Sequence, residues 1–539
     1  MEFVGRVIRD EDAQRYVREG FWRDESLGEL LAAGLVEAAT HPFVVRSDRN
    51  PFRGTLGDVD ALARRVAAGM RARGVERGDA VAFQLPNWLE AAATFYAATY
   101  LGAVIVPIVH FYGPKEVDYI LRKTRVKALV TADHFGHQDF LANLDGLREL
   151  PDLEWVAVVG DRGGRDLLAF DDLTNAGSLD TVATVDARSP ALIAYTSGTT
   201  SNPKGVVHSH RTINAEIHQL SAMQDSRGGP AVIIGAPVGH GIGMLAALLI
   251  PVFRRAEIHL IDVWDPGRVL EAMLDEGLSA GQGSTFFLTS LLDHPDFDPD
   301  RHAKLMPFIG LGGSAVPAAV GERCAALGIE TARSYGSTEH PSITGSYPET
   351  AHDKRVATDG SPLPGVEMRL VDDDGNDVEG GEPGEIWSRG PDQFVGYTDA
   401  AETAAAFSAD GWFMTGDIGV LDGDGYMTIT DRKKDIIIRG GENVSAAEIE
   451  EQLIRLPGVA EVAVVAAPDE RLGEHACAFL RMQLDATAPD LGAVRAHLEG
   501  AGLARQKWPE EVRTVVDFPR TASGKVQKFV LRRQLQEGV

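Results

Sequence analysis

Short apolar runs alternate with longer amphipathic stretches from about residue 80 onward. The runs at 80–83 and 104–107 have the length of buried strands, and the stretch 88–100 between them has helical spacing. Further apolar runs at 128–130 and 155–159 continue the pattern. Strand-like runs that alternate with amphipathic helices are typical of a parallel sheet in an α/β layer architecture.

The same alternation resumes after a polar connection at 160–190. We expect strands at 231–234, 257–261 and 308–311, and helices at 266–276 and 317–327. Two successive blocks of this kind predict two related α/β sheets in one large N-terminal portion.

The composition and the expected elements of the chain change twice after this point. From about residue 360 it is rich in Gly, Pro and Asp with short strands such as 385–388, which predicts a β-barrel-like subdomain. Beyond 431 a helix at 446–456 and a strand at 462–465 indicate a compact α+β domain of ordinary size. The expected division is an N-terminal domain at 1–430, a connection at 431–434 and a C-terminal domain at 435–539.

Composition narrows the classes of partner. The chain has 539 residues, 79 of them Asp or Glu against 52 Lys or Arg, for a formal net charge of −27. Because nucleic-acid binding depends on neutralising phosphates, a chain this acidic is a poor candidate for it. Any anionic substrate must therefore meet local cations.

Cysteine usage and hydropathy point to a reducing compartment. Cys324 and Cys477 are far apart and lack metal-ligand spacing, so we expect neither a disulfide nor a zinc site. The longest apolar run, at 244–253, is interrupted by Pro251 and is too short to span a bilayer. The N-terminus has no signal-peptide pattern, so the predicted location is cytoplasmic.

A loop of small and hydroxylated residues follows the apolar run 191–194. Thr196-Ser197-Gly198-Thr199-Thr200 brings backbone N–H groups and hydroxyls close to a ligand, and Lys204 adds a cation. Donors and a cation without carboxylates suit a polyphosphate. The alternative is a surface loop of turn formers. The P-loop of kinases and ATPases is excluded, because Gly205 follows Lys204 where that motif needs Ser or Thr.

Further motifs follow in order along the chain. They are Gly312-Gly313-Ser314-Ala315, Tyr335-Gly336-Ser337-Thr338-Glu339, Thr415-Gly416-Asp417, Asp431-Arg432-Lys433-Lys434-Asp435, Gly440-Gly441-Glu442-Asn443-Val444 and Pro519-Arg520-Thr521-Ala522-Ser523-Gly524-Lys525. Each alone is compatible with a turn or a solvated charge cluster. Together they offer an aromatic face for a purine, few carboxylates for Mg²⁺, and one carboxylate for two ribose hydroxyls.

In this order, over about residues 195–525, the motifs resemble those of the adenylate-forming superfamily. That superfamily comprises acyl-CoA synthetases, the adenylation domains of peptide synthetases, and luciferases. The resemblance implies ATP, Mg²⁺ and coenzyme A as ligands, and a small mobile C-terminal domain that turns on a hinge at Lys434. It implies that the nucleotide and coenzyme A are bound by Thr196, Ser197, Gly198, Thr199, Thr200, Lys204, Gly313, Ser314, Ala315, Tyr335, Gly336, Thr338, Asp417, Arg432, Lys525, Gly440 and Gly441.

The resemblance also implies roles in the reaction. Lys525 would act in adenylation, Glu339 would hold Mg²⁺, and Thr338 and Lys204 would contact the phosphates. Gly440 and Gly441 would lie along the pantetheine channel. His240 could gate the substrate carboxylate, and a histidine that merely starts a helix is the alternative.

Two positions depart from the family's usual wording. Ser201 stands where relatives commonly have Gly, which retains a hydroxyl donor but costs backbone freedom. Arg333 stands where many relatives have Gln or Asn, which puts the hydrogen bonding of adenine at this position in question.

The residues around the expected acid pocket are small or apolar. They are Gly241, Gly243, Met244, Gly283, Phe286, Phe287 and Gly310. This predicts a roomy apolar pocket. The wording of 200–204 and of 335–340 is similar to that of ligases for medium-chain or alicyclic acids.

The predicted function is ligation of a medium-chain, alicyclic or branched carboxylic acid to coenzyme A, with release of AMP and pyrophosphate. One alternative is an acyl-AMP ligase that loads a carrier-protein pantetheine. A second is a luciferase-like oxygenase, and a third is a non-catalytic nucleotide-binding regulator. A homodimer remains one possible oligomeric state.

Overall fold

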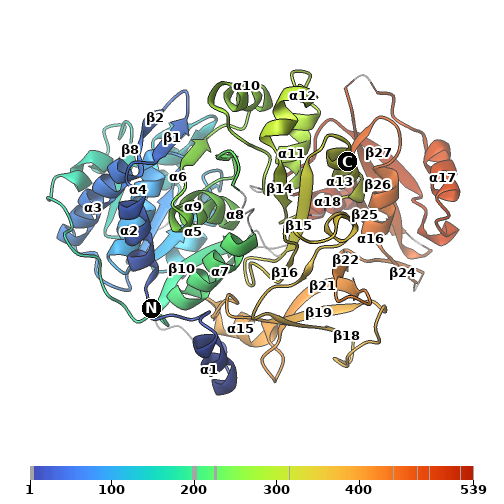
Figure 1. Ribbon diagram of the computed structural model, residues 1–539, viewed down its shortest axis with the longest axis horizontal. Coiled ribbons are helices and arrows are strands. Elements are labelled where there is room, and N and C mark those ends of the chain that lie inside the picture. Colours follow the sequence, from blue (N-terminus) through green and yellow to red (C-terminus); the bar gives the residue numbers. More distant parts are fainter. Residues whose placement is uncertain are drawn as a thin grey trace.

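The computed structural model describes residues 5–147, 149–196, 203–223, 228–314, 316–440, 442–469, 471–484, 486–521 and 524–537 (Figure 1). Its helices are α1 (Asp10–Arg18), α2 (Leu27–Glu37), α3 (Leu56–Ala72), α4 (Leu89–Tyr100), α5 (Pro114–Lys123), α6 (Phe140–Asp145), α7 (His210–Met223), α8 (Gly241–Met244), α9 (Ile250–Arg254), α10 (Pro266–Glu276), α11 (Thr285–Leu292), α12 (Pro299–His302), α13 (Ala318–Ala326), α14 (His352–Ala357), α15 (Ala400–Ala406), α16 (Ala446–Leu453), α17 (Leu491–Gly500) and α18 (Lys528–Glu537). Within these residues, no helix combines the length and apolar character needed to cross a membrane.

The first sheet has eight strands and carries the expected α/β alternation. Its order is β20 (Gly396–Tyr397), β11 (Lys204–Ser209), β10 (Pro190–Thr196), β4 (Val104–Pro107), β3 (Ala80–Gln84), β5 (Ala128–Ala132), β8 (Trp155–Val159) and β9 (Leu168–Ala169). The strands from β10 to β9 pair in parallel. Helix α4 is buried from Ala91 to Tyr100, because α2 and α3 cover its outer face.

The second sheet is interleaved with the start of the chain. Strands β12 (Ile233–Ile234), β13 (Ile258–Ile261), β1 (Pro42–Arg46) and β2 (Phe52–Thr55) form one part. Strands β14 (Phe308–Leu311), β15 (Glu330–Tyr335), β16 (Thr344–Gly345) and β17 (Ser361–Pro362) form the other. Parallel bridges from Ser279 to Val232 and from Gly283 to Leu311 connect the two parts. The expected second α/β block is therefore completed by β1 and β2 from the N-terminus.

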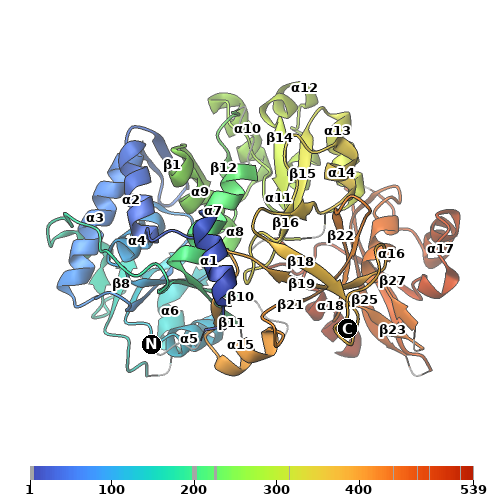
Figure 2. The same cartoon turned by 60° about the horizontal axis from the view of Figure 1, so that its bottom comes forward.

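An antiparallel sheet follows, in agreement with the short strands expected from about residue 360. Its order is β18 (Glu367–Val371), β19 (Gly384–Arg389), β21 (Phe413–Leu421) and β22 (Met427–Arg432). Figures 1 and 2 show it along one side of the molecule, between the first sheet and the C-terminal elements.

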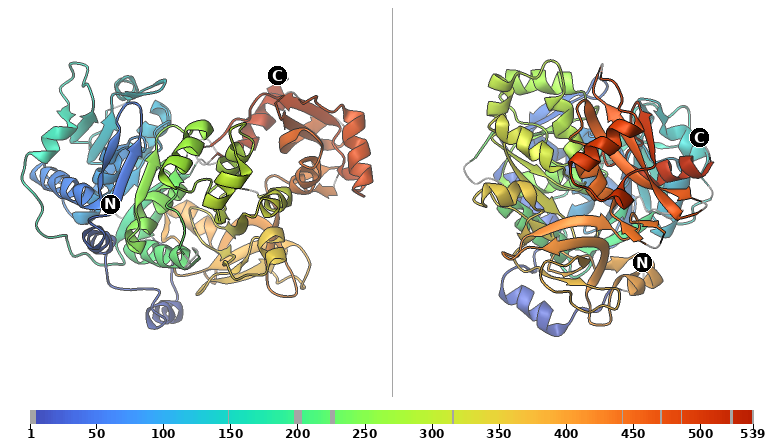
Figure 3. Two further views of the ribbon diagram at one scale, coloured as in Figure 1. Left: turned by 45° about the horizontal axis from the view of Figure 1, so that its top comes forward. Right: turned by 90° about the vertical axis from the view of Figure 1, so that its right-hand side faces the viewer.

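The C-terminal part is a small α+β domain with its own core. Five strands, β23 (Ile437–Arg439), β24 (Glu442–Val444), β25 (Val459–Asp469), β26 (Gly473–Met482) and β27 (Glu511–Val515), form its sheet. Helices α16 and α17 contribute Ile449, Leu453, Val494 and Leu498 to the core. Figure 3 shows this domain beside the second half of the N-terminal portion and far from the first sheet. The expected connection at 431–434 lies where β22 ends.

Most expected elements match the structure within a few residues. The strand at 308–311 and the helix at 266–276 have the predicted bounds, whereas the expected strand at 231–234 is only β12, Ile233–Ile234. Strand β11 was not predicted. Its few apolar residues follow the polar loop directly, and it pairs antiparallel with β10 in a hairpin.

Candidate active site

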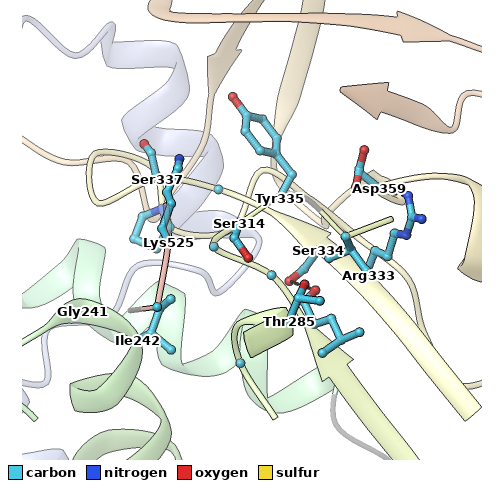
Figure 4. Close-up of a pocket in the computed structure, with 18 of the residues that line it drawn as sticks. Gly241, Ile242, Thr285, Ser314, Arg333, Ser334, Tyr335, Ser337, Asp359 and Lys525 are labelled. Carbon is cyan, nitrogen blue, oxygen red and sulfur yellow. Dashed lines mark hydrogen bonds and ion pairs between the residues drawn. The ribbon is translucent and has the colours of Figure 1, made fainter. Parts of the chain in front are cut away.

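A cavity of about 1870 Å³ lies where the N-terminal sheets and the C-terminal domain meet (Figure 4). Residues from β10, β11, α8, β14, β15, β21 and β22 line it, as does the loop before α18. Most of the residues singled out from the sequence are in its wall: Thr196, Lys204, His240, Gly313, Ser314, Tyr335, Gly336, Thr338, Glu339, Asp417, Arg432, Lys434 and Lys525.

The remaining sequence-predicted residues divide into two groups. Ser197, Gly198, Thr199, Thr200, Ala315 and Gly441 lie outside the described residues. Gly440 is described and exposed, and its N–H donates to the Leu472 carbonyl at 2.8 Å. It is not part of the cavity wall, so the structure brings Lys525 to the cavity while Gly440 lies elsewhere on the C-terminal domain.

Lys204 enters the cavity from the β10–β11 hairpin. Strand pairing sets it opposite Thr196, so the polar loop between them connects two fixed strand ends. Its Nζ atom lies 4.9 Å from the centre of the Tyr397 ring and 3.9 Å from the Glu402 carboxylate. A half-exposed ammonium on an aromatic face suits the phosphates of an anionic ligand.

Glu339 lies on the loop after β15. Tyr397 donates a hydrogen bond of 2.8 Å to its carboxylate, and its own carbonyl accepts from the Phe394 N–H at 2.7 Å. The neighbouring Thr338 carbonyl is 2.8 Å from His208 Nε2. Because burial lowers the pKa of His208 to about 4, the ring is neutral and donates through that nitrogen.

The donor set at Glu339 fits Mg²⁺ bound with a polyphosphate. Within the described residues, no three His, Cys, Asp or Glu side chains cluster as a metal site. A single carboxylate is nevertheless what Mg²⁺ takes from a protein when phosphate oxygens and water fill its other positions.

Asp417 is held between an aromatic and a cationic side chain. Tyr335 donates to it at 2.7 Å and Arg432 at 2.6 Å, because β21 and β22 pair Asp417 with Arg432 directly. The carboxylate is almost fully buried, and burial raises the pKa of the Tyr335 phenol, which therefore stays protonated and donates. A fixed carboxylate beside an aromatic ring can accept hydroxyls of a ribose whose base lies on that ring.

Lys525 reaches the cavity from the segment before α18 of the C-terminal domain. Its carbonyl accepts from the Thr521 N–H at 2.7 Å, and a Cβ on Gly524 would lie 3.0 Å from Phe286 Cβ. Gly524 thus packs closely on α11, and Arg520 stacks on the Phe286 ring at 5.0 Å. Burial, and then the charge of Arg432, lower the pKa of Lys525 to about 8. The amine is thus cationic at neutral pH and titrates just above it.

His240 starts a helix and also lines the cavity, and its action on the substrate carboxylate stays a prediction. It caps α8, its Nδ1 accepting from the Ile242 N–H at 3.4 Å, and it also lines the cavity. Burial lowers its pKa to about 4, so it faces the cavity as a neutral ring.

The small residues around the expected acid pocket are not equivalent. At Gly241 and Gly310 an added Cβ would meet no atom within 4 Å, and both positions line the cavity. At Gly243 a Cβ would lie 2.1 Å from the Pro237 carbonyl, so this glycine is needed for backbone packing. A short π-helix, Leu245–Leu249, follows α8 in the same wall.

Two parts of the wall were not anticipated from the sequence. Tyr397 contacts both Glu339 and Lys204. It follows a glycine in β20 and belongs to no recognisable sequence motif. Asp359, which lies 3.9 Å from Arg333, belongs to none of the sequence motifs. Only the folding of the chain brings these two residues to the cavity.

The fold and the cavity define an α/β enzyme whose small C-terminal domain supplies a lysine to a site on the large domain. The sequence profile of the AMP-binding enzyme family matches residues 37–398, and that of the AMP-binding enzyme C-terminal domain matches 448–525. The chain therefore belongs to the AMP-binding enzyme family, and it is an AMP-forming acid–thiol ligase.

Individual relatives match nearly from end to end. The medium-chain fatty-acid–CoA ligase of Escherichia coli (strain K12) is 32% identical over 538 residues, covering 99% of this chain and 94% of the relative. A 3-(7a-methyl-1,5-dioxo-octahydro-1H-inden-4-yl)propanoyl:CoA ligase of Rhodococcus jostii (strain RHA1) is 35% identical, covering 89% and 93%. The crystal structure of ATP-bound MatB from Rhodopseudomonas palustris matches with a TM-score of 0.81 at 30% identity, covering 95% of this chain and 99% of that one.

Proposed function

We propose that this chain joins a carboxylic acid to coenzyme A in two steps, through an acyl-adenylate made from ATP. The observation that carries the proposal is the meeting of Lys204, Glu339, Asp417 and Lys525 around one cavity, although they come from four distant segments. A nucleotide site that has lost catalysis, or that only regulates, would not require all four of these side chains.

In the first step a carboxylate oxygen of the acid attacks the α-phosphorus of ATP. A P–O bond forms to the acid, the bond to the β-phosphate bridging oxygen breaks, and pyrophosphate leaves. Two like charges 4 Å apart repel by about 4 kcal/mol at an effective dielectric of 20. Lys525, whose buried amine is still cationic at neutral pH, offsets this repulsion at the reacting centre.

The other cavity residues position the nucleotide. Asp417 accepts hydrogen bonds from the ribose hydroxyls, and the Tyr335 ring packs against the base. Lys204 and Thr338 contact the phosphates. Mg²⁺, held by Glu339, would neutralise charge on the phosphate oxygens. Tyr397 holds the Glu339 carboxylate in place by its hydrogen bond.

In the second step the coenzyme A thiolate attacks the acyl carbonyl, and AMP leaves. This step has no use for Lys525 at the phosphates. Turning the C-terminal domain about Lys434 would withdraw Lys525 and present Gly440 and Gly441 to the site instead. We accordingly assign 1–430 to the large domain, 431–434 to the hinge and 435–539 to the mobile domain.

The acid is proposed to be medium-chain, alicyclic or branched. The wall beyond His240 is apolar, with Ile242, Leu245 and Phe286, and it is open at Gly241 and Gly310. The names of the Escherichia coli and Rhodococcus relatives include both a medium-chain and an alicyclic substrate.

The test is the release of AMP and pyrophosphate over a panel of short, medium-chain, alicyclic, aromatic and branched acids, each with and without coenzyme A. We expect acid-dependent pyrophosphate release that leads to acyl-CoA only when coenzyme A is present. A chain that acylates a carrier-protein pantetheine but not free coenzyme A would be an acyl-AMP ligase. Light or CO₂ formed from an acyl-adenylate in air would indicate a luciferase-like oxygenase.

A further inference from the structure

A cluster of fully buried polar side chains lies behind the loop that carries Glu339. Glu216 of α7, His340 of that loop, and Asp392 between β19 and β20 are each 0% exposed. The reaction roles assigned above use none of these three side chains. Burying two carboxyl groups and an imidazole costs free energy unless each is hydrogen-bonded, so their partners indicate what the cluster does.

Asp392 is the centre of this cluster. Its Oδ1 lies 3.1 Å from His340 Nε2, and its Oδ2 accepts from the Ser342 N–H at 3.2 Å. Because a carboxylate only accepts, the His340 ring donates through Nε2. The other ring nitrogen, Nδ1, is 2.8 Å from the Ser388 hydroxyl. One carboxylate thus holds both the side chain of His340 and the backbone two residues later.

Glu216 completes the cluster from the helix side. Its Oε1 accepts from the Ser342 hydroxyl at 2.8 Å, while no donor to Oε2 is found within the described residues. Burial, and then the charge of Asp392, raise the pKa of Glu216 well above its usual range, so this carboxyl group is the protonated one. A protonated Glu216 is itself a donor, and Asp392 is an acceptor within reach of its side chain. The two acids therefore share one proton and tie α7 to the segment after β19.

The cluster fixes the backbone around Glu339. His340, whose ring is held by Asp392, follows Glu339 directly in the sequence. Phe394, two residues after Asp392, donates its N–H to the Glu339 carbonyl at 2.7 Å. The Ser337 N–H donates to the His340 carbonyl at 3.0 Å and closes the loop on itself. The direction in which the Glu339 side chain leaves the loop thus depends on contacts made by Asp392 and its neighbours.

We propose that Glu216, Asp392 and His340 are positioning residues for the first step, which hold Glu339 where its carboxylate meets Mg²⁺ bound to the phosphates of ATP. This inference rests on the metal role that the proposed function gives to Glu339. Tyr397 holds the Glu339 carboxylate directly, whereas the cluster holds the backbone from which that side chain extends. Buried polar networks whose members are all hydrogen-bonded make the segments that they join rigid.

A purely structural cluster makes a different prediction. If these residues only stabilised the packing of α7 against the loop, their loss would lower the melting temperature and weaken the binding of every nucleotide alike. Positioning of Glu339 requires a selective loss. Binding of Mg·ATP should weaken, whereas AMP, which lacks the β- and γ-phosphates and binds through Asp417 and Tyr335, should bind almost as before.

The experiment is calorimetric titration of the full chain with Mg·ATP, with ATP in EDTA, and with AMP. In the unaltered chain we expect Mg²⁺ to strengthen the binding of ATP. Asp392→Asn takes the charged acceptor away from His340, so Mg·ATP should bind about tenfold more weakly and AMP should change by less than about twofold.

Two substitutions at Glu216 test the shared proton and replace Asp392→Asn if that variant fails to fold. Glu216→Leu leaves Asp392 without this donor and Ser342 without its acceptor, so it should show the same selective loss of Mg·ATP binding. Glu216→Gln can accept from Ser342 and donate to Asp392, so it should restore binding of Mg·ATP to about that of the unaltered chain. Equal losses in the two Glu216 variants would contradict a role as a neutral donor and overturn the inference.

Asp60→Asn is the matched control. Asp60 accepts from the Tyr100 hydroxyl at 2.7 Å and from Arg64 at 2.8 Å, and it does not line the cavity. Its change should lower the melting temperature and leave the ratio of Mg·ATP to AMP affinity as it was. An unchanged ratio in a folded Asp392→Asn protein, or equal losses for both nucleotides, overturns the inference. Mg·ATP binding without any acid-dependent release of pyrophosphate would instead count against the proposed function.

Discussion

The hydroxyl of Tyr397 donates a hydrogen bond of 2.8 Å to the carboxylate of Glu339. The same ring lies under the ammonium of Lys204, at 4.9 Å from its centre. One aromatic side chain on β20 thus fixes the spacing between the proposed metal ligand and a proposed phosphate contact. We expect the proposed chemistry to depend on this spacing, because charge stabilisation requires groups that are held in place before the reaction.

Tyr397→Phe removes the hydrogen bond to Glu339 and leaves the ring under Lys204. A hydrogen bond to a charged group contributes about 1.5–3 kcal/mol, so we expect the KM for Mg·ATP to rise about tenfold or more with little change in melting temperature. Steady-state kinetics at varied Mg·ATP measure this. Tyr426→Phe is the control, since Tyr426 stacks under Lys354 at 5.1 Å and is not in the cavity wall. An unaltered KM in Tyr397→Phe would show that Glu339 needs no support.

Lys525→Ala should separate the two steps. Loss of a cation at the reacting phosphate slows adenylation by about 10²–10³-fold, by analogy with the loss of one electrostatic stabiliser in other active sites. Thioester formation from a preformed acyl-adenylate should change by less than threefold. Pyrophosphate release and acyl-CoA formation, followed separately, measure the two rates. Lys507→Ala, which breaks only the pair of Lys507 with Glu448 at 2.6 Å, should leave both steps intact.

The first step should lose activity at alkaline pH. Burial and the charge of Arg432 lower the pKa of Lys525 to about 8, so its amine becomes neutral as the pH rises through that value. We expect kcat/KM for ATP to fall about tenfold per pH unit well above pH 8, since kcat/KM reports groups of the free enzyme. A Lys525→Arg protein should keep a flat profile to higher pH, because arginine stays charged. A profile of Lys525→Arg that matches the unaltered protein would assign the titration to another group.

The same shift has a consequence for stability. The pKa of Lys525 is lower in the folded chain than its ordinary value of 10.5, so the unfolded chain binds the proton more tightly between about pH 8 and 10.5. The contribution of this group to the free energy of unfolding therefore rises with pH over that window. Lys525→Met should remove this rise, as measured by denaturant unfolding at several pH values.

Lys434→Pro should spare adenylation and slow thioester formation. Proline fixes φ, so a connection that must change its backbone angles for the domain to turn would be locked near one conformation. Lys434→Ala keeps the backbone freedom and should leave both steps near their original rates. Equal loss of both steps in Lys434→Pro, measured by separate half-reactions, would indicate damage to the fold in place of a blocked hinge.

Substitution by alanine should have different effects at two glycines in the cavity wall, one on stability and the other on the range of acids used. A Cβ at Gly336 would lie 1.9 Å from the Pro341 carbonyl, so Gly336→Ala should lower the free energy of unfolding by about 1–3 kcal/mol. A Cβ at Gly310 would meet no atom within 4 Å. Gly310→Ala should therefore fold normally and lose activity only on the bulkiest acids. Thermal unfolding and the acid panel measure the two effects, and full activity of Gly310→Ala on every acid would place the acyl group elsewhere.

Local patterns were sufficient to predict elements whose character depends on neighbours in sequence. The helix at 266–276 begins after Asp265, whose side chain accepts from the Arg268 N–H, and ends at Gly277 in the left-handed region. Such caps are short-range signals. The pairing of β1 with β13, and the insertion of β1 and β2 into the second sheet, join segments more than 200 residues apart and leave no local signal.

The order of the motifs along the chain predicted the phosphate loop, the Tyr335–Glu339 motif, Asp417, the hinge region and Lys525 through their resemblance to a known superfamily, because each motif alone is compatible with a turn or a charge cluster. Folding decided which of them meet: Lys525 lines the cavity, whereas Gly440 does not. Folding also added Tyr397, which contacts Glu339 and Lys204, and Asp359, which lies beside Arg333. The distance between two side chains depends on how the whole chain packs, so no short segment of the sequence determines it.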